Sequence, residues 1–165
     1  MKRKKLSTLV NHVYPANSSL HPLNFFVPLV EQVKNGVVSI VTAGKTSSSD
    51  LKRLIHEFLG DELEDVTQRN FGSGFIFHPK GYILTSEHVV ANSETILVKL
   101  CDGRVFQAKP VYTNETRDYA VLKINAGPRI QPLPLGSSAE TRVGEWVLSI
   151  GAPMGLENSV TAECT

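Results

Sequence analysis

The chain has 165 residues, of which 41% are hydrophobic and 20% charged, so it can bury the core of one domain and is not a wholly disordered chain. Its 17 basic and 16 acidic residues leave a formal net charge of +1, which gives no support for nucleic acid or an acidic membrane as the main partner. The two cysteines, Cys101 and Cys164, lie far apart, and they provide neither a metal-binding spacing nor a disulfide framework.

Residues 1–24 are predicted to be a flexible polar lead-in. They open with the basic run Met1–Lys5, but the residues that follow include many polar side chains and Pro15. A secretory signal needs roughly 7–15 consecutive apolar residues and a membrane helix needs about 20, and no window supplies either. We therefore expect no membrane segment. The sequence leaves the compartment unknown, with the cytoplasm as the default.

Residues 25–126 are predicted to form one antiparallel β-barrel, entered through a short helix or hook over residues 25–33. Apolar, β-branched runs bounded by turn signals predict six strands, enough to close a small barrel and remove its exposed edges. The fourth strand alternates in hydrophobicity, and Asp102-Gly103 after it predicts a two-residue hairpin. The predicted strands lie at 37–42, 71–77, 82–85, 95–100, 104–112 and 118–124.

A long loop over residues 43–70 interrupts this barrel. Apolar residues recur in it at helical spacing between Leu51 and Leu59, after an N-cap residue at Asp50 and before a stop at Gly60. The pattern predicts an amphipathic helix. Two roles stay open for this helix: packing against its own domain, or binding a partner and gating a site.

Residues 127–165 are predicted to be a linker and the incomplete start of a second barrel. Proline and glycine are frequent over 125–135, an apolar strand follows at 143–151, and a second run lies at 159–162. Two strands do not make a domain. We therefore expect the chain to stop soon after its second domain begins.

Two residues carry the strongest chemical signal. His88 follows the apolar strand that ends at Thr85 and starts a helical turn, and Asp118 heads a later apolar strand. A histidine oriented by an aspartate is the acid–base part of a nucleophilic triad, in which the histidine takes the proton from a serine. A lone histidine near a strand end is more often structural, but the two residues in this order and setting favour catalysis.

The third member of such a triad, a serine, is not evident. Four serines follow Asp118, and none precedes paired glycines whose N–H groups could form an oxyanion hole. They are Ser137, Ser138, Ser149 and Ser159.

Gly72-Ser73-Gly74 is not a nucleophile elbow, which needs Gly-x-Ser-x-Gly. The other histidines lack ligand-like spacing and no phosphate loop is present, so no metal and no cofactor is predicted.

Taken together, these blocks resemble the HtrA/DegP family of trypsin-like serine proteases, from about Pro28 to Ala162. The resemblance implies a trypsin-like β-barrel in which His88 is the general base and Asp118 its orienting partner. The family's nucleophilic serine and its C-terminal PDZ domain have no counterpart in these residues. The matching blocks are Gly72-Ser73-Gly74-Phe75-Ile76, Gly81–Thr85 with His88-Val89-Val90, Asp102-Gly103-Arg104, Asp118 with Ala120–Ile124, Leu133–Gly136, Val143–Val147 and Ile150–Pro153.

The resemblance also implies a function, a serine endopeptidase that hydrolyses peptide bonds of misfolded proteins. Its partners would be unfolded or extended polypeptide and further copies or relatives, in a trimer formed through the N-terminal region. The family mostly works outside the cytoplasm. Because the serine is missing, we predict a truncated chain that is inactive alone. Two alternatives stay open: a non-catalytic pseudoprotease module that binds peptides or forms hetero-oligomers, and a degenerate gene product.

Overall fold

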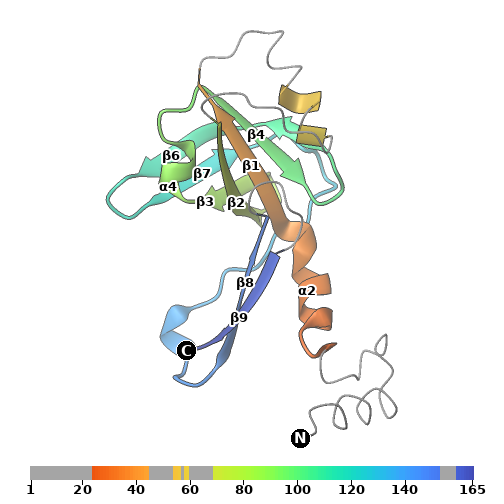
Figure 1. The fold of residues 1–165 in the computed structure, drawn as a ribbon, viewed down its shortest axis with the longest axis vertical. Helices are drawn as coiled ribbons and strands as arrows, with labels where there is room; N and C mark the ends of the chain where they lie inside the picture. The colour runs from red at the N-terminus through yellow and green to blue at the C-terminus, as the bar shows by residue number, and fades with distance from the viewer. Residues whose placement is uncertain (1–23, 45–53, 57, 60–68, 153–158) are drawn as a thin grey trace, which may run out of the picture. The chain divides into compact units, whose positions relative to one another are not determined.

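The computed structural model describes residues 24–44, 54–56, 58–59, 69–152 and 159–165, and Figure 1 shows the elements they form. The chain forms two units, Met1–Val33 and Lys34–Thr165. The described part of the first unit ends in α2 (Val27–Val33), where a short helix or hook is expected over 25–33. The predicted lead-in over 1–24 lies almost wholly outside the described residues. None of the described helices has the length and hydrophobicity to cross a bilayer.

The second unit begins with η2 (Lys34–Gly36) and is built on one seven-stranded antiparallel sheet, which confirms the prediction of a mostly β, antiparallel fold. The strand order is β5-β4-β1-β2-β3-β7-β6, so β5 and β6 occupy the two ends of the sheet. The strands are β1 (Val37–Ala43), β2 (Arg69–His78), β3 (Tyr82–Thr85), β4 (Thr95–Leu100), β5 (Val105–Gln107), β6 (Lys109–Asn114) and β7 (Tyr119–Lys123).

The prediction of a single strand over 104–112 is wrong, because the chain changes edge within it. β5 ends at Gln107, and β6 begins at Lys109 on the opposite end of the sheet. Between them, the buried Ala108 donates its backbone N–H to the Ile96 carbonyl of β4 at 2.9 Å. Since one residue connects the two end strands, the sheet must curl until its ends meet there, and this is how the barrel closes.

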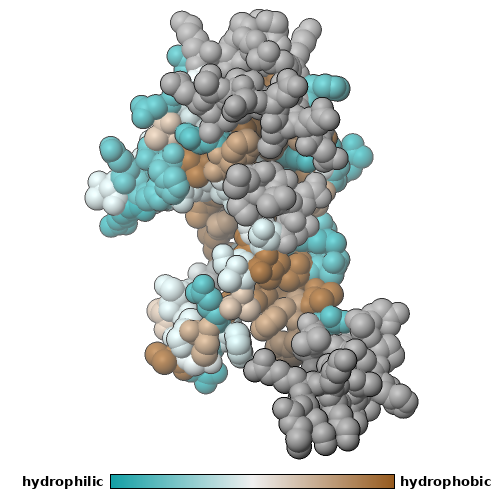
Figure 2. All heavy atoms as spheres, in the orientation of Figure 1, coloured by the Kyte–Doolittle hydropathy of each residue, from teal (hydrophilic) through white to brown (hydrophobic). Residues whose placement is uncertain are grey.

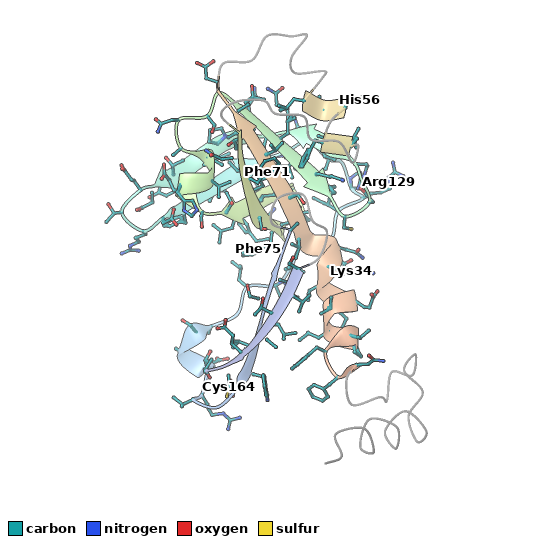
Figure 3. The ribbon with its side chains drawn as sticks, viewed as in Figure 1. Lys34, His56, Phe71, Phe75, Arg129 and Cys164 are labelled. Atoms are coloured by element: carbon teal, nitrogen blue, oxygen red, sulfur yellow. The ribbon has the colours of Figure 1, made fainter. Side chains whose placement is uncertain are left out.

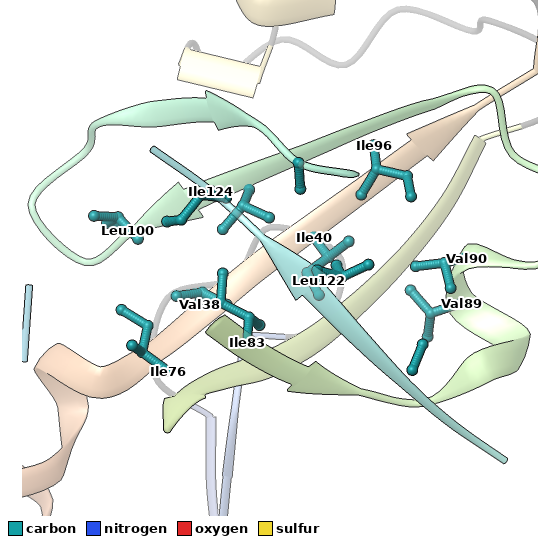
Figure 4. Packing of buried hydrophobic residues seen from close by; sticks show 13 residues of the cluster. Val38, Ile40, Ile76, Ile83, Val89, Val90, Ile96, Leu100, Leu122 and Ile124 are labelled. Carbon is teal, nitrogen blue, oxygen red and sulfur yellow. The ribbon is translucent and has the colours of Figure 1, made fainter. Parts of the chain in front are cut away.

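Two apolar clusters lie on opposite faces of the sheet. β1 runs through the middle of the sheet, and its side chains alternate between the clusters, as the two-residue period of a strand requires. Val38 and Ile40 join the larger cluster, drawn in Figure 4, whereas Val41 joins the smaller one. The predicted alternation of β4 is confirmed in the same way, with Ile96 and Val98 in the larger cluster.

The smaller cluster contains part of the helix predicted in the long loop. Residues 54–56 and 58–59 are helical, and Leu54 and Phe58 are buried against Val41 and Leu97. Phe71, which Figure 3 labels on β2, packs against the same cluster. These contacts support packing as a role of the helix. Its predicted cap and stop residues lie outside the described residues, and gating stays a prediction.

After β7 the chain passes through η3 (Ser138–Glu140) to a separate two-stranded antiparallel sheet. It consists of β8 (Trp146–Gly151) and β9 (Ser159–Cys164), with Trp146 opposite Cys164. All six residues of β9 are exposed, and so are the side chains of Val143 and Trp146. Figure 2 shows hydrophobic residues in brown and hydrophilic residues in teal on the visible face of the molecule. The domain boundary between 126 and 127 stays a prediction.

Candidate active site

His88 lies on α4 (Glu87–Val90), a four-residue helical turn that follows β3. A helix this short does not stabilise itself, because nucleation fixes several backbone dihedrals for one hydrogen bond. That bond runs from the Ala91 N–H to the Glu87 carbonyl at 2.9 Å. Ser86 occupies the N-cap in an extended conformation, but its side chain makes no capping hydrogen bond. Contacts with the rest of the fold must therefore hold α4 in place.

Asp118 supplies the missing cap at the N-terminal end of α4. Its Oδ1 accepts the backbone N–H of His88 at 3.0 Å, which is the kind of bond that a capping side chain makes. Its Oδ2 lies 2.8 Å from Nδ1 of the His88 ring. One carboxylate thus binds both the backbone and the imidazole of the same residue, which fixes the ring relative to the helix.

The backbone of Asp118 is in an unusual conformation that brings its carboxylate to α4. Its φ is +48°, in the left-handed region that side-chain-bearing residues other than Asn and Asp seldom adopt. Asn114 Oδ1 accepts the Arg117 N–H at 2.9 Å, and the Glu115 carbonyl accepts the Asp118 N–H at 3.2 Å. These bonds close the turn before β7. Asn114 is a site residue that was not predicted, although an asparagine in a polar turn is the signal for such a side-chain-to-backbone bond.

The hydrogen bonds to Asp118 decide which ring nitrogen of His88 carries the proton. The His88 backbone N–H, first, and then its imidazole lower the pKa of Asp118, against a smaller effect of desolvation. An ionised carboxylate only accepts hydrogen bonds, so Nδ1 is the protonated nitrogen of the neutral ring. Its Nε2 then carries the lone pair, and no side chain of the described residues hydrogen-bonds it. The His88 side chain is 71% exposed and that of Asp118 49%, so the pair faces solvent.

A hollow of about 320 Å³ opens beside Asp118, between the middle of β2 and the C-terminal ends of β3 and β8. Phe75, labelled in Figure 3, lines it together with Thr85, Ser86 and Ile150. Ser73 also lines it, but its hydroxyl oxygen accepts the backbone N–H of Ala152 at 2.8 Å. This bond ties the end of β8 to the first sheet and gives Ser73 a structural role.

The structure brings the two predicted site residues together and adds no serine to them. None of the four serines after Asp118 forms a hydrogen bond with His88; Ser137 precedes η3, Ser149 lies within β8, and Ser159 begins β9. Among the described residues, no group of three or more His, Cys, Asp and Glu side chains could hold a metal ion. His78 accepts the Lys80 N–H at 3.1 Å in the β2–β3 turn, a structural role.

Comparisons with known proteins relate this chain to trypsin-like serine proteases. The trypsin-like peptidase domain model matches residues 72–164. A probable periplasmic serine endoprotease, DegP-like, of Halomonas elongata is 36% identical, and the match covers 83% of this chain and 33% of the relative. A protein of the same description from Hahella chejuensis is 38% identical, and the match covers 83% of this chain and 32% of the relative. A solved structure of the HtrA-type protease AlgW with a tripeptide has a TM-score of 0.66 at 28% identity, over 83% of this chain and 38% of that one. The chain therefore spans about a third of the length of the curated relatives it matches.

Proposed function

Because the chain belongs to the trypsin-like peptidase family and resembles its HtrA/DegP-type serine proteases, we propose that it carries the acid–base half of a serine endopeptidase site. In this proposal His88 is the general base and Asp118 orients it. The observation that carries the proposal is the pair of hydrogen bonds by which the Asp118 carboxylate holds the backbone and the ring of His88. They keep the proton on Nδ1 and leave the lone pair on Nε2.

The proposed reaction uses this lone pair. Nε2 of His88 takes the proton of a serine hydroxyl while the serine oxygen forms a bond to the scissile carbonyl carbon. The ring becomes an imidazolium, and the ionised Asp118 stabilises its charge through the Nδ1–H. When the tetrahedral intermediate collapses, the C–N bond breaks and Nε2 gives the proton to the leaving amine. The lowered pKa of Asp118 supports this role, because a protonated carboxyl could not stabilise the cation in this way.

The polypeptide of these 165 residues is proposed to be inactive alone. No described serine is bonded to His88, and no paired glycines follow Asp118 to supply the N–H groups of an oxyanion hole. Catalysis would then need a serine and an oxyanion hole from a second β-domain, of which β8 and β9 are the first strands. The greater length of the relatives supports this division of the site.

The proposed substrate is a polypeptide in an unfolded or extended form. The relatives are named serine endoproteases, and a solved relative is described with a tripeptide. We assign the N-terminal region as the trimer contact, because Phe25, Val27 and Leu29 expose apolar side chains there. The name periplasmic, given to the relatives, favours a site of action outside the cytoplasm, and the cytoplasmic default has no such support.

A non-catalytic binding module is the second candidate. β9 pairs with β8 along one edge, and its six residues are exposed. An extended peptide can add to such an edge through main-chain hydrogen bonds. The same edge is an aggregation hazard, which fits the alternative of a degenerate gene product equally well.

A fluorophosphonate probe, which forms a covalent adduct with activated serines, separates these functions. Intact mass is expected to show no adduct on the purified 165-residue chain. An adduct that disappears in His88→Ala would refute the inactivity of the chain alone. In the native cells, any labelled polypeptide that contains residues 69–124 is expected to lose its label in His88→Ala, and persistent labelling would refute the general-base role of His88.

Two further readouts on the same preparation separate the remaining alternatives. Binding of an extended peptide without labelling favours the binding module. Urea unfolding without a cooperative transition favours the degenerate product, since a folded domain of this size unfolds in one step.

A further inference from the structure

We propose that Thr42 of β1 is a positioning residue that holds α4, and with it His88, where Asp118 can bind the ring. The Thr42 hydroxyl donates to the backbone carbonyl of Val89 at 3.1 Å, and Val89 directly follows His88. Thr42 is only 1% exposed, so water does not compete for this bond. The inference rests on the proposed function, because it assigns a support to the proposed general base.

Packing alone does not account for a threonine at this position. Residue 42 lies on the same face of β1 as Val38 and Ile40, which belong to the larger apolar cluster. Valine has nearly the shape of threonine and would fill the same space without a polar atom. A buried hydroxyl is unfavourable unless it is hydrogen-bonded. Here its partner is one of the last-turn carbonyls, which have no intrahelical donor in a helix as short as α4.

Thr42 and Asp118 bind backbone groups of two neighbouring residues of α4. Asp118 accepts the His88 N–H, and Thr42 donates to the carbonyl of the next residue. β1 is a rigid support, because it pairs with both β2 and β4 in the middle of the sheet. Gly72 of β2 leaves the room that this packing needs, since a Cβ there would lie 2.5 Å from Cγ1 of Val89. The backbone on both sides of the His88 ring is thus fixed.

Thr42→Val and Thr42→Ser in the 165-residue chain test the proposal. Valine keeps the shape and removes the donor, whereas serine keeps the donor. In Thr42→Val, hydrogen exchange of the Ala91 amide is expected to be about tenfold faster, the factor that corresponds to the loss of one buried hydrogen bond. The pKa of Asp118, measured by carboxyl ¹³C NMR, is expected to rise toward its ordinary value, because the His88 N–H is held less firmly. Thr42→Ser is expected to keep both wild-type values.

Three results would overturn the proposal. The first is wild-type Ala91 exchange and Asp118 titration in Thr42→Val. The second is the same change in Thr42→Ser as in Thr42→Val. The third is faster exchange throughout the sheet with an unchanged Asp118 titration, the sign of a merely structural role.

If Thr42→Val does not fold, a measurement on the wild-type chain still tests the proposal. Its Thr42 hydroxyl proton is expected to exchange slowly with water and to show a nuclear Overhauser contact with Val89, and a freely exchanging hydroxyl would overturn the proposal. Failure of the proposed function has a different signature. It would appear in the wild-type chain itself, as an Asp118 with an ordinary pKa.

Discussion

Replacing Gly72 by alanine tests whether the space beneath α4 is as tight as the structure indicates. A Cβ on Gly72 would lie 2.5 Å from Cγ1 and 2.6 Å from Cγ2 of Val89. Val89 is 6% exposed and β-branched, so its side chain cannot readily turn away. β2 cannot retreat either, because Gly72 pairs with Ile40 in the sheet. We expect Gly72→Ala to lower the free energy of unfolding by about 1–3 kcal/mol, the usual range for overpacking a core.

Urea unfolding followed by circular dichroism measures this change. Gly136→Ala is the matched control, because a Cβ on Gly136 meets no atom within 4 Å, and its effect is expected to stay within about 0.5 kcal/mol. Val89→Ala removes both methyl groups that the new Cβ would meet. In that background Gly72→Ala is expected to have little effect, a coupling of about 1–3 kcal/mol between the two positions. An equal loss of stability in both backgrounds would refute the assignment of this space to Val89.

Leu122 is fully buried on β7, so Leu122→Ala is expected to lower the free energy of unfolding by about 2–5 kcal/mol in the same assay. A loss of stability well below this range would contradict the assignment of Leu122 to the core. Gly81→Ala is expected to destabilise more than Gly103→Ala: both glycines have a φ of +83°, but only at Gly81 would a Cβ meet backbone, 2.5 Å from the Ile124 oxygen. Equal losses would contradict this. The pKa of Asp118 is expected below the ordinary aspartate value, so its stabilising contribution is present above the unfolded pKa and lost as pH falls through the folded one. Carboxyl ¹³C titration checks this, with Asp118→Asn to assign the signal, and an ordinary or raised pKa would contradict it.

Much of the first barrel could be predicted because its strands carry local signals. The β-branched run of β1 and the alternation of β4 are local signals of a strand, and both strands were assigned from the sequence, although β4 also buries Leu97 on its other face. The break at Ala108 was missed because the residues around it read as one strand. Barrel closure, a property of the whole sheet, makes the chain change edge there.

The candidate site, like the fold, contains some residues that could be predicted from the sequence and others that could not. His88 and Asp118 could be picked out because their flanking residues form recognisable blocks, and the family resemblance that those blocks indicated is confirmed. Thr42 and the neighbour of Gly72 could not, because they depend on contacts with Val89, 47 residues beyond Thr42 in the chain. A threonine in a strand and a glycine between strand residues are ordinary locally. Only the packing of α4 against β1 and β2 gives them a role.

The tautomer of His88 tests the central claim most directly. The proposed base needs its ring proton on Nδ1, donated to Asp118, and a free lone pair on Nε2. ¹⁵N NMR of the histidine-labelled chain, at a pH where the ring is neutral, distinguishes the two nitrogens, and Asp118→Ala is the control in which the preference for Nδ1 is expected to disappear. We predict the Nδ1-protonated ring in the wild-type chain. A ring protonated on Nε2 would contradict the account, because that nitrogen could not then take a proton from a serine.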